Sequence, residues 1–541
     1  MAIAPSRTVQ EYRSAVEHAQ RAGNVDEACR IAAEAAAAGI EDGWLLAMAV
    51  HHHLKNHDFG RAEASARRAC ALAPNDPVAI GALGLCLAAQ QRYPEAISAF
   101  DKALAIAPKS AALLYNKGFA QECANMPGQA KKTYQAALLA NPNHSQAAGQ
   151  LAYLHALQGE FAQARDLGRR ALAGDPSNPF GAFALSLAEI DAGRPDAVEA
   201  RLKTLAERPA ADVPTRVTAY GILGDALDAM AEYGRAYGYY ARKGEILRAA
   251  YAGPNAKSQL LRVKQLESYF SRADGTVWRG QAVAPPAPIR THVFLLGFAR
   301  SGTTLLENVL ATHPEIEVLA ERDALMDSYP ATDSDAALDA FAALGPEALQ
   351  EYRDAYWRRA REGGMPLVRP VFVDKLPMNS VVLCLIAKLF PEAKILFALR
   401  DPRDVVFSSF RRRFGMTPQM VELATLQGAA RYYDAVMSLV AVYRRVLSLD
   451  LHEVRLERLV DDFMGEMESL CRFVGVRGTE TMKRFEPKHT GRDVTTPSAA
   501  QLGKGLNDKG LGQWRNYAPQ MAEVMPLLQR WVEAYGYGDG K

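Results

Sequence analysis

The segment LLGFARSGTTLLENV, residues 295–309, decides how the C-terminal half of the chain folds. It continues the apolar run of 291–298, which reads as a buried parallel strand, into two glycines, an arginine and three hydroxyl residues. A helical pattern follows. A strand, a glycine loop and a helix in this order aim free backbone N–H groups and the positive helix end at an anion. The segment therefore predicts an anion-binding loop.

The loop departs from the usual nucleotide-binding pattern at one position. Gly297 and Gly302 have the spacing of the Walker loop, but Thr303 and Thr304 stand where a lysine and a hydroxyl residue would follow. Without that lysine, we do not expect the loop to bind the β- and γ-phosphates of a nucleotide beside magnesium. Arg300, inside the loop, supplies the positive charge instead. A purely structural turn is the alternative interpretation.

Two later segments place basic residues at the ends of predicted strands. AKILFALRDPRDVVFSSFRRRF, 393–414, again reads as strand, turn and helix, with Arg400 at the strand end and Ser408 eight residues later. In 368–380, Lys375 ends another predicted strand. Carboxyl ends of parallel strands meet at one edge of a sheet, where such folds bind ligands, so we expect these side chains to lie near the loop. An arginine and a serine side chain together can bind a phosphate monoester through hydrogen bonds. A surface Arg–Asp pair at a helix start is the alternative for Arg400.

The N-terminal half of the chain is rich in alanine and repeats every 34 residues. The positions that share this spacing are Ala28, Ala62, Ala96, Ala130 and Ala164, with Pro74, Pro108, Pro142 and Pro176. In the unit 77–110, small residues at Gly84 and Ala96 let two helices approach, Phe100 fills the groove between units, and Pro108 ends the second helix; the next unit repeats this pattern.

This pattern resembles the tetratricopeptide repeat. The predicted units are 9–42, 43–76, 77–110, 111–144 and 145–178, a degenerate one near 179–212, and another over 217–250. The resemblance implies a solenoid whose concave surface binds peptides or protein segments.

The composition changes after the repeats. Residues 255–270 read as a helix that caps the solenoid, and glycines and a proline cluster then rule out a continuing helix. We therefore predict an all-α solenoid of six to seven repeats over 1–254, a capping helix and proline-rich joint over 255–289, and an α/β domain with a parallel sheet over 290–541.

Taken together, the C-terminal motifs resemble the sulfotransferases that use 3′-phosphoadenosine-5′-phosphosulfate (PAPS). The similarity is to the tyrosylprotein sulfotransferase-like branch and to bacterial fusions of tetratricopeptide repeats with a sulfotransferase, and it covers about 290–535. It implies a P-loop-like α/β fold. In that family R-S-G-T-T-L holds the 5′-phosphosulfate, and the matching residues are Arg300, Ser301, Gly302, Thr303, Thr304 and Leu305. The family's R-D-x-R-x-x-x-x-S holds the 3′-phosphate, which matches Arg400 and Ser408.

The resemblance also implies a catalytic base. The family branch places a glutamate shortly after a His-Pro pair, and the matching residue in THPEIEVLAERDAL is Glu321. Competing candidates are His313, Glu315 and Glu317, and the alternative role for Glu321 is a solvated carboxylate or a simple ion pair. The implied reaction is in-line displacement at sulfur, with Glu321 as general base. Lys375 and Arg300 would stabilise the charge on the leaving oxygen, and no metal is implied.

The tail 495–521 resembles the family segment that covers the nucleotide, but it departs from it at two positions. Gly503 stands where the family has an arginine, and Asn507 stands where it has a tyrosine. Lys504 is therefore a candidate cofactor contact, with Lys509 as an alternative. Whether these departures weaken cofactor binding stays open at this point.

Composition limits the classes of partner and compartment. A net charge of +2 gives no bulk electrostatic reason to expect a nucleic-acid partner. No uncharged apolar stretch approaches the length of a transmembrane span, and the N-terminus lacks the apolar core of a secretory signal. The six cysteines are scattered, as expected for free thiols in a reducing compartment. These features predict a cytoplasmic protein.

The sequence predicts an enzyme that transfers a sulfuryl group from PAPS to an acceptor hydroxyl and releases 3′-phosphoadenosine-5′-phosphate (PAP). The acceptor can be a tyrosine, a sugar, a lipid or a phenol, and the repeats favour a peptide, protein or glycan that they recruit. One alternative is a repeat scaffold whose C-terminal domain binds nucleotide without turnover. Another is a P-loop kinase, against which the missing lysine argues.

Overall fold

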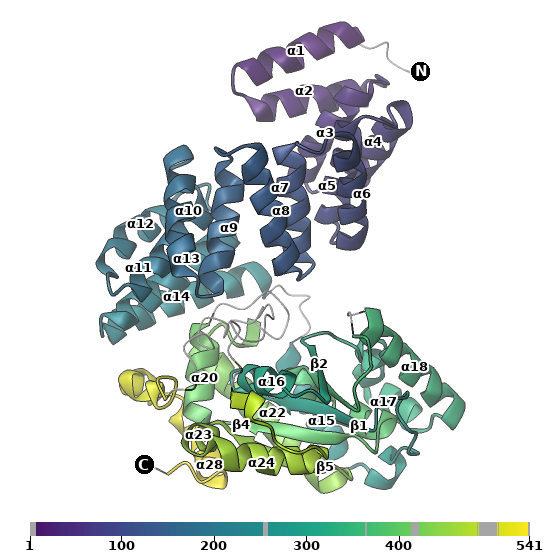
Figure 1. Cartoon of the computed structure of the whole chain (residues 1–541), viewed down its shortest axis with the longest axis vertical. Coiled ribbons are helices and arrows are strands. Elements are labelled where there is room, and N and C mark those ends of the chain that lie inside the picture. Colours follow the sequence, from purple (N-terminus) through teal and green to yellow (C-terminus); the bar gives the residue numbers. More distant parts are fainter. Residues whose placement is uncertain are drawn as a thin grey trace. The chain divides into compact units, whose positions relative to one another are not determined.

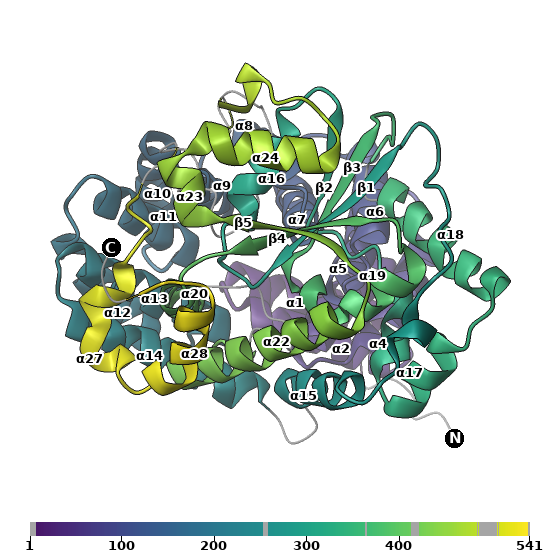
Figure 2. The same cartoon turned by 90° about the horizontal axis from the view of Figure 1, so that it is seen from below.

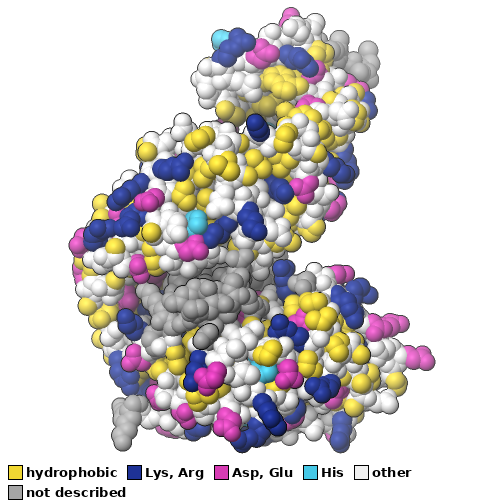
Figure 3. Space-filling model, viewed as in Figure 1, with side chains coloured by type: hydrophobic (Ala, Val, Ile, Leu, Met, Phe, Trp, Pro, Cys, Tyr) yellow, Lys and Arg dark blue, Asp and Glu magenta, His cyan; other side chains and the backbone are white. Residues whose placement is uncertain are grey.

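The computed structural model describes residues 7–252, 258–362, 365–412, 421–483, 485, 506 and 508–538. The chain divides into two compact units, Met1–Asp191 and Ala192–Lys541. This division falls earlier than residue 254, the predicted end of the solenoid, because the last repeat-like helices pack with the sheet domain. Basic and acidic side chains are interspersed over the face shown in Figure 3, as the near-neutral composition leads one to expect.

The first unit is a stack of antiparallel helix pairs, and the predicted run of paired helices is confirmed (Figure 1). Its helices are α1 (Val9–Arg21), α2 (Val25–Ala37), α3 (Gly43–Lys55), α4 (Phe59–Leu72), α5 (Pro77–Ala89), α6 (Tyr93–Ile106), α7 (Ala111–Cys123), α8 (Pro127–Ala140), α9 (Ser145–Leu157), α10 (Phe161–Gly174) and α11 (Pro179–Asp191).

In two repeats of the first unit, close helix approach depends on a glycine facing an aromatic ring. A Cβ atom on Gly84 would lie 2.7 Å from the ring of Phe100, and one on Gly118 would lie 2.6 Å from the ring of Tyr134. Both rings are fully buried. Helix starts are fixed by side chains that accept backbone N–H bonds, as Asp76 does from Val78 at the start of α5. Small residues and caps thus produce the predicted repeat geometry.

The second unit begins with three helices that continue the repeat pattern. They are α12 (Asp196–Glu207), α13 (Val213–Ala229) and α14 (Tyr233–Tyr251). Gly224 faces the buried ring of Tyr240, so the pair seen in the first unit recurs here. On α14, however, the buried Lys243 Nζ donates to the backbone oxygens of Phe410 at 2.6 Å and Arg412 at 2.9 Å. The last repeat pair is therefore bonded to the sheet domain.

Among the described residues, the sheet has five strands in the order β2-β3-β1-β4-β5, and every neighbouring pair is parallel. The strands are β1 (Thr291–Gly297), β2 (Ile316–Ala320), β3 (Val371–Lys375), β4 (Lys394–Leu399) and β5 (Asp450–Arg455). The chain crosses from β3 on one side of β1 to β4 on the other. Their carboxyl ends thus flank that of β1, where the strand order reverses and such sheets bind ligands.

Different helices cover the two faces of the sheet (Figure 2). One face packs on α16 (Thr303–Ala311) and α24 (Phe463–Val474), as Val293 and Leu295 share a buried cluster with Leu306 and Leu470. The other face packs on α15 (Gln259–Phe270), α18 (Pro346–Glu362), α19 (Leu383–Leu389), α20 (Pro402–Arg411) and α22 (Leu426–Val446). The remaining described helical segments are η1 (Gly275–Trp278), η2 (Met326–Thr332), α17 (Asp335–Ala342), η3 (Pro377–Val382), α23 (Leu456–Asp461), η4 (Glu480–Lys483), η5 (Gln513–Tyr517), α27 (Ala518–Met521) and α28 (Met525–Ala534).

The predicted capping helix and joint are packed parts of the second unit. We expected α15 to cap the solenoid, but it packs on α22, with the rings of Phe270 and Tyr443 centred 4.9 Å apart. Trp278 in η1 is fully buried against Phe270. The joint therefore adds to the core of the second unit.

Two expectations came from the composition: one concerned membrane-spanning helices and the other the state of the cysteines. Among the described helices, none combines the length and apolar character that a bilayer crossing needs. All six cysteines are free thiols.

Two glycines on α14 provide a test of how closely this helix packs on the sheet domain. A Cβ atom on Gly244 would collide with the backbone oxygen of Ala424, whereas one on Gly238 would meet nothing within 4 Å. Gly244→Ala should therefore lower the melting temperature of the full chain, at a cost of about 1–3 kcal/mol for overpacking. Gly238→Ala, the matched control, should raise it, because alanine favours a helix interior by about 1 kcal/mol. Calorimetry of both variants checks this, and equal effects would contradict the close packing.

Candidate active site at the carboxyl edge of the sheet

The loop between β1 and α16 is a tight turn that opens a helix N-terminus. Gly297 and Gly302 have φ angles of 151° and 97°, and Arg300 takes a left-handed φ of 73°. A Cβ atom on Gly297 would lie 2.7 Å from the backbone oxygen of Ala398 on β4, so this position requires glycine. Gly302 is the N-cap of α16, and within the described chain no side chain caps that helix. The first N–H groups of α16 are thus suited to bind an anion.

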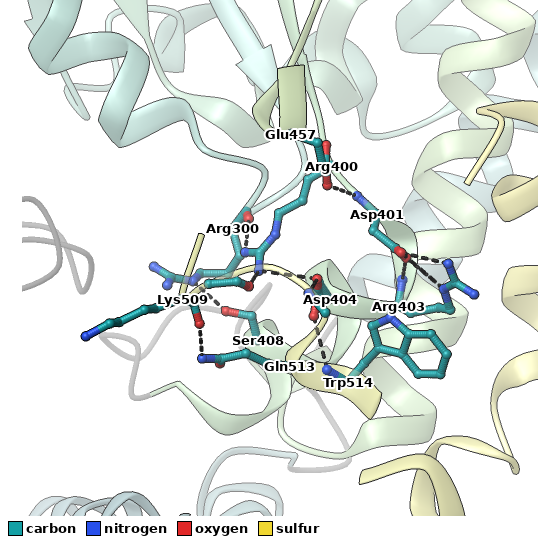
Figure 4. Close-up of polar contacts among 12 residues, drawn as sticks. Arg300, Arg400, Asp401, Arg403, Asp404, Ser408, Glu457, Lys509, Gln513 and Trp514 are labelled. Carbon is teal, nitrogen blue, oxygen red and sulfur yellow. Dashed lines mark hydrogen bonds and ion pairs between the residues drawn. The ribbon is translucent and has the colours of Figure 1, made fainter. Parts of the chain in front are cut away.

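The predicted basic and hydroxyl residues meet beside this loop (Figure 4). Arg300 Nε donates to Ser408 Oγ on α20 at 3.0 Å. Arg400, which follows β4, donates through Nη1 to the backbone oxygen of Arg300 at 3.2 Å. Ser301, Thr303 and Thr304 are buried in the same turn and helix start; Leu305 is partly buried. Two segments far apart in sequence, the loop after β1 and the β4–α20 segment, therefore meet here, and Arg300 contacts both Arg400 and Ser408.

Positive charge is concentrated at this point. Burial, and then the charges of Arg412, Arg400 and Arg411, lower the pKa of Arg300 below its ordinary value. Arg400 is itself only 7% exposed, and its Nε has no hydrogen-bond partner among the described residues. Clustered buried guanidinium groups repel one another, and a bound anion would relieve that repulsion. The cluster therefore has the electrostatic character of an anion site.

The tail contacts the same cluster through Arg400 and Asp404. Arg400 Nη2 donates to the backbone oxygen of Gly510 and lies 3.8 Å from Asp404 Oδ2. Asp404 accepts the backbone N–H groups of Gly512 at 2.6 Å and Trp514 at 3.1 Å. Burial raises the pKa of the Asp404 carboxyl. Segment 508–517 is thus bonded to the helix that carries Ser408.

The ring of Trp514 also contacts the start of α20. The guanidinium of Arg403 lies 4.3 Å from the Trp514 ring centroid, and Asp401 holds Arg403 at 2.8 Å. Glu457 accepts the backbone N–H of Asp401 and the hydroxyl of Tyr537, so its role here is structural. Lys504 lies outside the described residues, as do Gly503 and Asn507, so these predictions stay predictions. Lys509 is described, next to the bonded Gly510 (Figure 4).

Lys375 and Glu321 form a second cluster at the same edge of the sheet. Glu321 follows β2 with a φ of 47°, and its backbone N–H donates to the backbone oxygen of Lys375 at 2.9 Å. Lys375 Nζ donates to Glu321 Oε1 at 2.7 Å and lies 2.7 Å from Glu307 Oε2 on α16. The Lys375 side chain is fully buried, whereas the Glu321 side chain is 36% exposed. An accessible carboxylate is thus fixed by a buried ammonium group.

The competing base candidates have other partners. Glu317 accepts the backbone N–H groups of Leu367 and Val368 at 3.1 and 3.0 Å. His313 Nε2 lies 2.8 Å from the backbone oxygen of Arg477, and Glu315 faces Arg290 at 3.8 Å. Glu321 differs from these three residues in its contact with the buried lysine.

Two charged residues of the site were missed by sequence reasoning. Glu307 lies four residues after Thr303, so the two share one face of α16, and this spacing was a usable signal. Asp404 could not be found from the sequence, because no neighbouring residue indicates that backbone N–H groups of the tail bind to it.

Asp374, beside Lys375 on β3, points to the opposite face of the sheet, as neighbouring strand residues do. It accepts the hydroxyl of Tyr356 at 2.9 Å, and that hydroxyl lies 2.9 Å from His292 Nε2. Burial raises the pKa of Asp374 to about 7 and lowers that of His292 to about 3. His292 is therefore neutral at neutral pH, whereas Asp374 is protonated only below about pH 7.

Two segments of the chain match models of known protein families. Residues 292–480 match the model of the sulfotransferase family, and residues 47–111 and 124–179 match the tetratricopeptide repeat. The chain thus carries a sulfotransferase-family domain after tetratricopeptide repeats, as predicted from the motifs.

Two curated relatives are similar over part of the chain. An uncharacterized protein of Aquifex aeolicus is 23% identical over 429 residues, which are 76% of this chain and 53% of that protein. The chain thus spans about half the length of that relative. Protein-tyrosine sulfotransferase 2 of Gallus gallus is 25% identical over 272 residues, 44% of this chain and 68% of that protein.

Solved structures match the repeat part at low similarity. PilF of Pseudomonas aeruginosa is 18% identical with a TM-score of 0.33, over 38% of this chain and 94% of that one. Cut9–Hcn1 of the APC/C is 12% identical with a TM-score of 0.36, over 42% of this chain and 45% of that one.

Asp374 should make stability depend on pH. Its folded pKa of about 7 lies above the ordinary 3.8, so the folded state binds the proton more tightly than the unfolded state. This contribution is fully present below the ordinary value and is lost as pH rises through about 7. Asp374→Asn keeps an acceptor for Tyr356 without a charge, so its melting temperature should exceed that of the wild type increasingly as pH rises. Scanning calorimetry across this range checks it, with the exposed Asp335→Asn as control; a pH-independent difference would contradict the assignment.

Proposed function

We propose that this chain is a PAPS-dependent sulfotransferase that moves a sulfuryl group to an acceptor hydroxyl, with Glu321 as general base. The single observation that supports it most is the convergence of Arg300, Arg400 and Ser408 on the open N-terminus of α16, within the sulfotransferase-family segment. Beside that cluster, a half-exposed carboxylate is held by a buried lysine. An anion-binding site and a general base at the same edge of the sheet are the two components that sulfuryl transfer needs.

The residues present fit PAPS. Arg300, Thr303, Thr304 and the N–H groups at the start of α16 would hold the 5′-phosphosulfate, while Arg400 and Ser408 would hold the 3′-phosphate. The buried Arg400 Nε, without a hydrogen-bond partner in the described chain, supplies a donor for that phosphate. When bound, PAPS supplies the sulfuryl group, whose bond to the phosphate oxygen breaks as a bond to the acceptor oxygen forms, the electron pair leaving with PAP.

Glu321 and Lys375 have different tasks in the proposed reaction: Glu321 accepts a proton, and Lys375 stabilises negative charge. Glu321 takes the proton of the acceptor hydroxyl, a step that general base catalysis accelerates by about 10²–10⁴-fold. Its exposure lets an acceptor reach it, and Lys375 fixes its orientation at 2.7 Å. An ammonium group has three N–H donors; one of those of Lys375 donates to Glu321, and Glu307 Oε2 lies 2.7 Å from the same nitrogen as an ion-pair partner. Lys375 would also stabilise charge on the leaving oxygen together with Arg300, because positioning and charge stabilisation dominate such transfers.

The repeats would recruit the acceptor, because such solenoids commonly bind peptides along their concave surface. The avian relative is named a protein-tyrosine sulfotransferase, so a tyrosine peptide is the first acceptor to try. A phenol such as 4-nitrophenol and an oligosaccharide complete a panel that covers the acceptor chemistries. Mass spectrometry of each for a product heavier by one SO₃ group identifies the acceptor.

Nucleotide preference tests the anion site. PAP should bind more tightly than ATP with magnesium, because the loop lacks the Walker lysine. Arg400→Ala should weaken PAP binding by about 10–100-fold, the worth of a charge-assisted hydrogen bond lost from a buried site. The exposed Arg472→Ala should leave PAP affinity unchanged. Isothermal calorimetry measures the affinities of the wild type and of both variants. Tighter binding of ATP with magnesium than of PAP would contradict the proposed nucleotide.

Removal of the Glu321 carboxylate tests the base. Glu321→Gln should leave PAP binding intact and lower sulfuryl transfer from labelled PAPS by about 10²–10⁴-fold. Glu315→Gln, an exposed carboxylate of the same region, should transfer at the wild-type rate. Unchanged turnover in Glu321→Gln would remove this residue as the base, while loss of PAP binding would show that it holds the nucleotide.

A further inference from the structure

A second carboxylate, Glu307, shares the ammonium group of Lys375 with Glu321. Lys375 Nζ lies 2.7 Å from Glu307 Oε2 and 2.7 Å from Glu321 Oε1. The two carboxylates differ in access, since the Glu307 side chain is 7% exposed and the Glu321 side chain 36%. An acceptor can therefore reach Glu321 and not Glu307. The two glutamates cannot have the same role.

The charge balance changes when the base accepts a proton. Glu321 becomes neutral at that moment and no longer offsets the positive charge of Lys375. A buried ammonium group that loses its counter-charge is strongly destabilised, because neither water nor a partner then solvates it. Glu307, shielded from the acceptor, does not take that proton and continues to pair with Lys375. It therefore keeps the lysine charged and in place while the proton moves.

The position of Glu307 also ties Lys375 to the anion loop. Glu307 stands one helical turn after Thr303 on α16, so the ion pair joins the helix behind the loop to the end of β3. Lys375 is the last residue of β3, and its backbone oxygen accepts the N–H of Glu321. The distance between loop and base is thus set through the Glu307–Lys375 pair.

We propose that Glu307 is a positioning residue, which holds Lys375 in register with the anion loop and supplies its counter-charge while Glu321 carries the acceptor's proton. This inference rests on the proposed function, because it assigns a task to Glu307 within the sulfuryl transfer.

The test compares Glu307→Gln with matched variants of the full chain, using labelled PAPS and the acceptor that the panel above selects. Glu307→Gln should lower kcat by about 10–100-fold, the range of one coupled charge interaction, with KM for PAPS and PAP affinity unchanged. Glu307→Asp keeps the charge on a shorter side chain and should recover part of kcat. Glu317→Gln, a carboxylate of similar burial that binds only Leu367 and Val368 among the contacts described, should leave kcat unchanged.

A double-mutant cycle with Lys375→Met separates positioning from general support of the fold. If Glu307 acts through Lys375, adding Glu307→Gln to Lys375→Met should lower kcat little further. The concentration of folded sites is counted in each variant by the stoichiometry of PAP binding, so partial unfolding cannot imitate a lower kcat.

The outcomes distinguish this inference from the proposed function. Wild-type kcat in Glu307→Gln, an equal loss in Glu317→Gln, or additive losses in the cycle would each overturn the role of Glu307 alone. A wild-type chain that neither binds PAP nor transfers label to any member of the panel would overturn the proposed function, and this inference with it.

Discussion

The requirement that buried charges be paired governs the carboxyl edge of the sheet. Lys375 is fully enclosed and lies between two carboxylates, and Arg400 is placed among a backbone oxygen of the loop, Asp404 and the tail. Apart from the Arg400–Asp404 pair, these contacts join segments that are distant in sequence. Pairing the charges therefore brings β1, β3, β4 and their following helices to one site, because unpaired charges there would cost several kcal/mol each.

Local sequence predicts the parts of the site that follow from strand ends. Lys375 and Arg400 could be placed because parallel strands finish at a common edge, and Arg300 because glycines on both sides mark a turn before a helix. The helix pairs of the repeats could also be predicted from the sequence. The 34-residue period indicates the repeat, and a glycine that faces an aromatic residue, as Gly84 faces Phe100, fixes how closely two helices pack.

Other features of the site depend on packing that a sequence does not display. The sequence motif grouped Ser408 with Arg400. In the structure Ser408 accepts a hydrogen bond from Arg300, because α20 lies against the loop. Glu307 reads as an ordinary helical glutamate until β3 is placed beside α16. The extent of the second unit is a similar case, because 213–251 repeat like the solenoid in sequence and pack with the sheet domain in space.

The bonds made by the last repeat pair affect how this chain can be divided. Lys243 occupies the backbone oxygens at the end of α20, Asp228 accepts the hydroxyl of Tyr517 at 2.5 Å, and Arg411 lies 3.6 Å from Asp228. A fragment cut where the sulfotransferase match begins, at 292, would leave these groups exposed and without partners. The compact unit that keeps them paired starts at Ala192, so the last repeat helices are a structural part of the sheet domain.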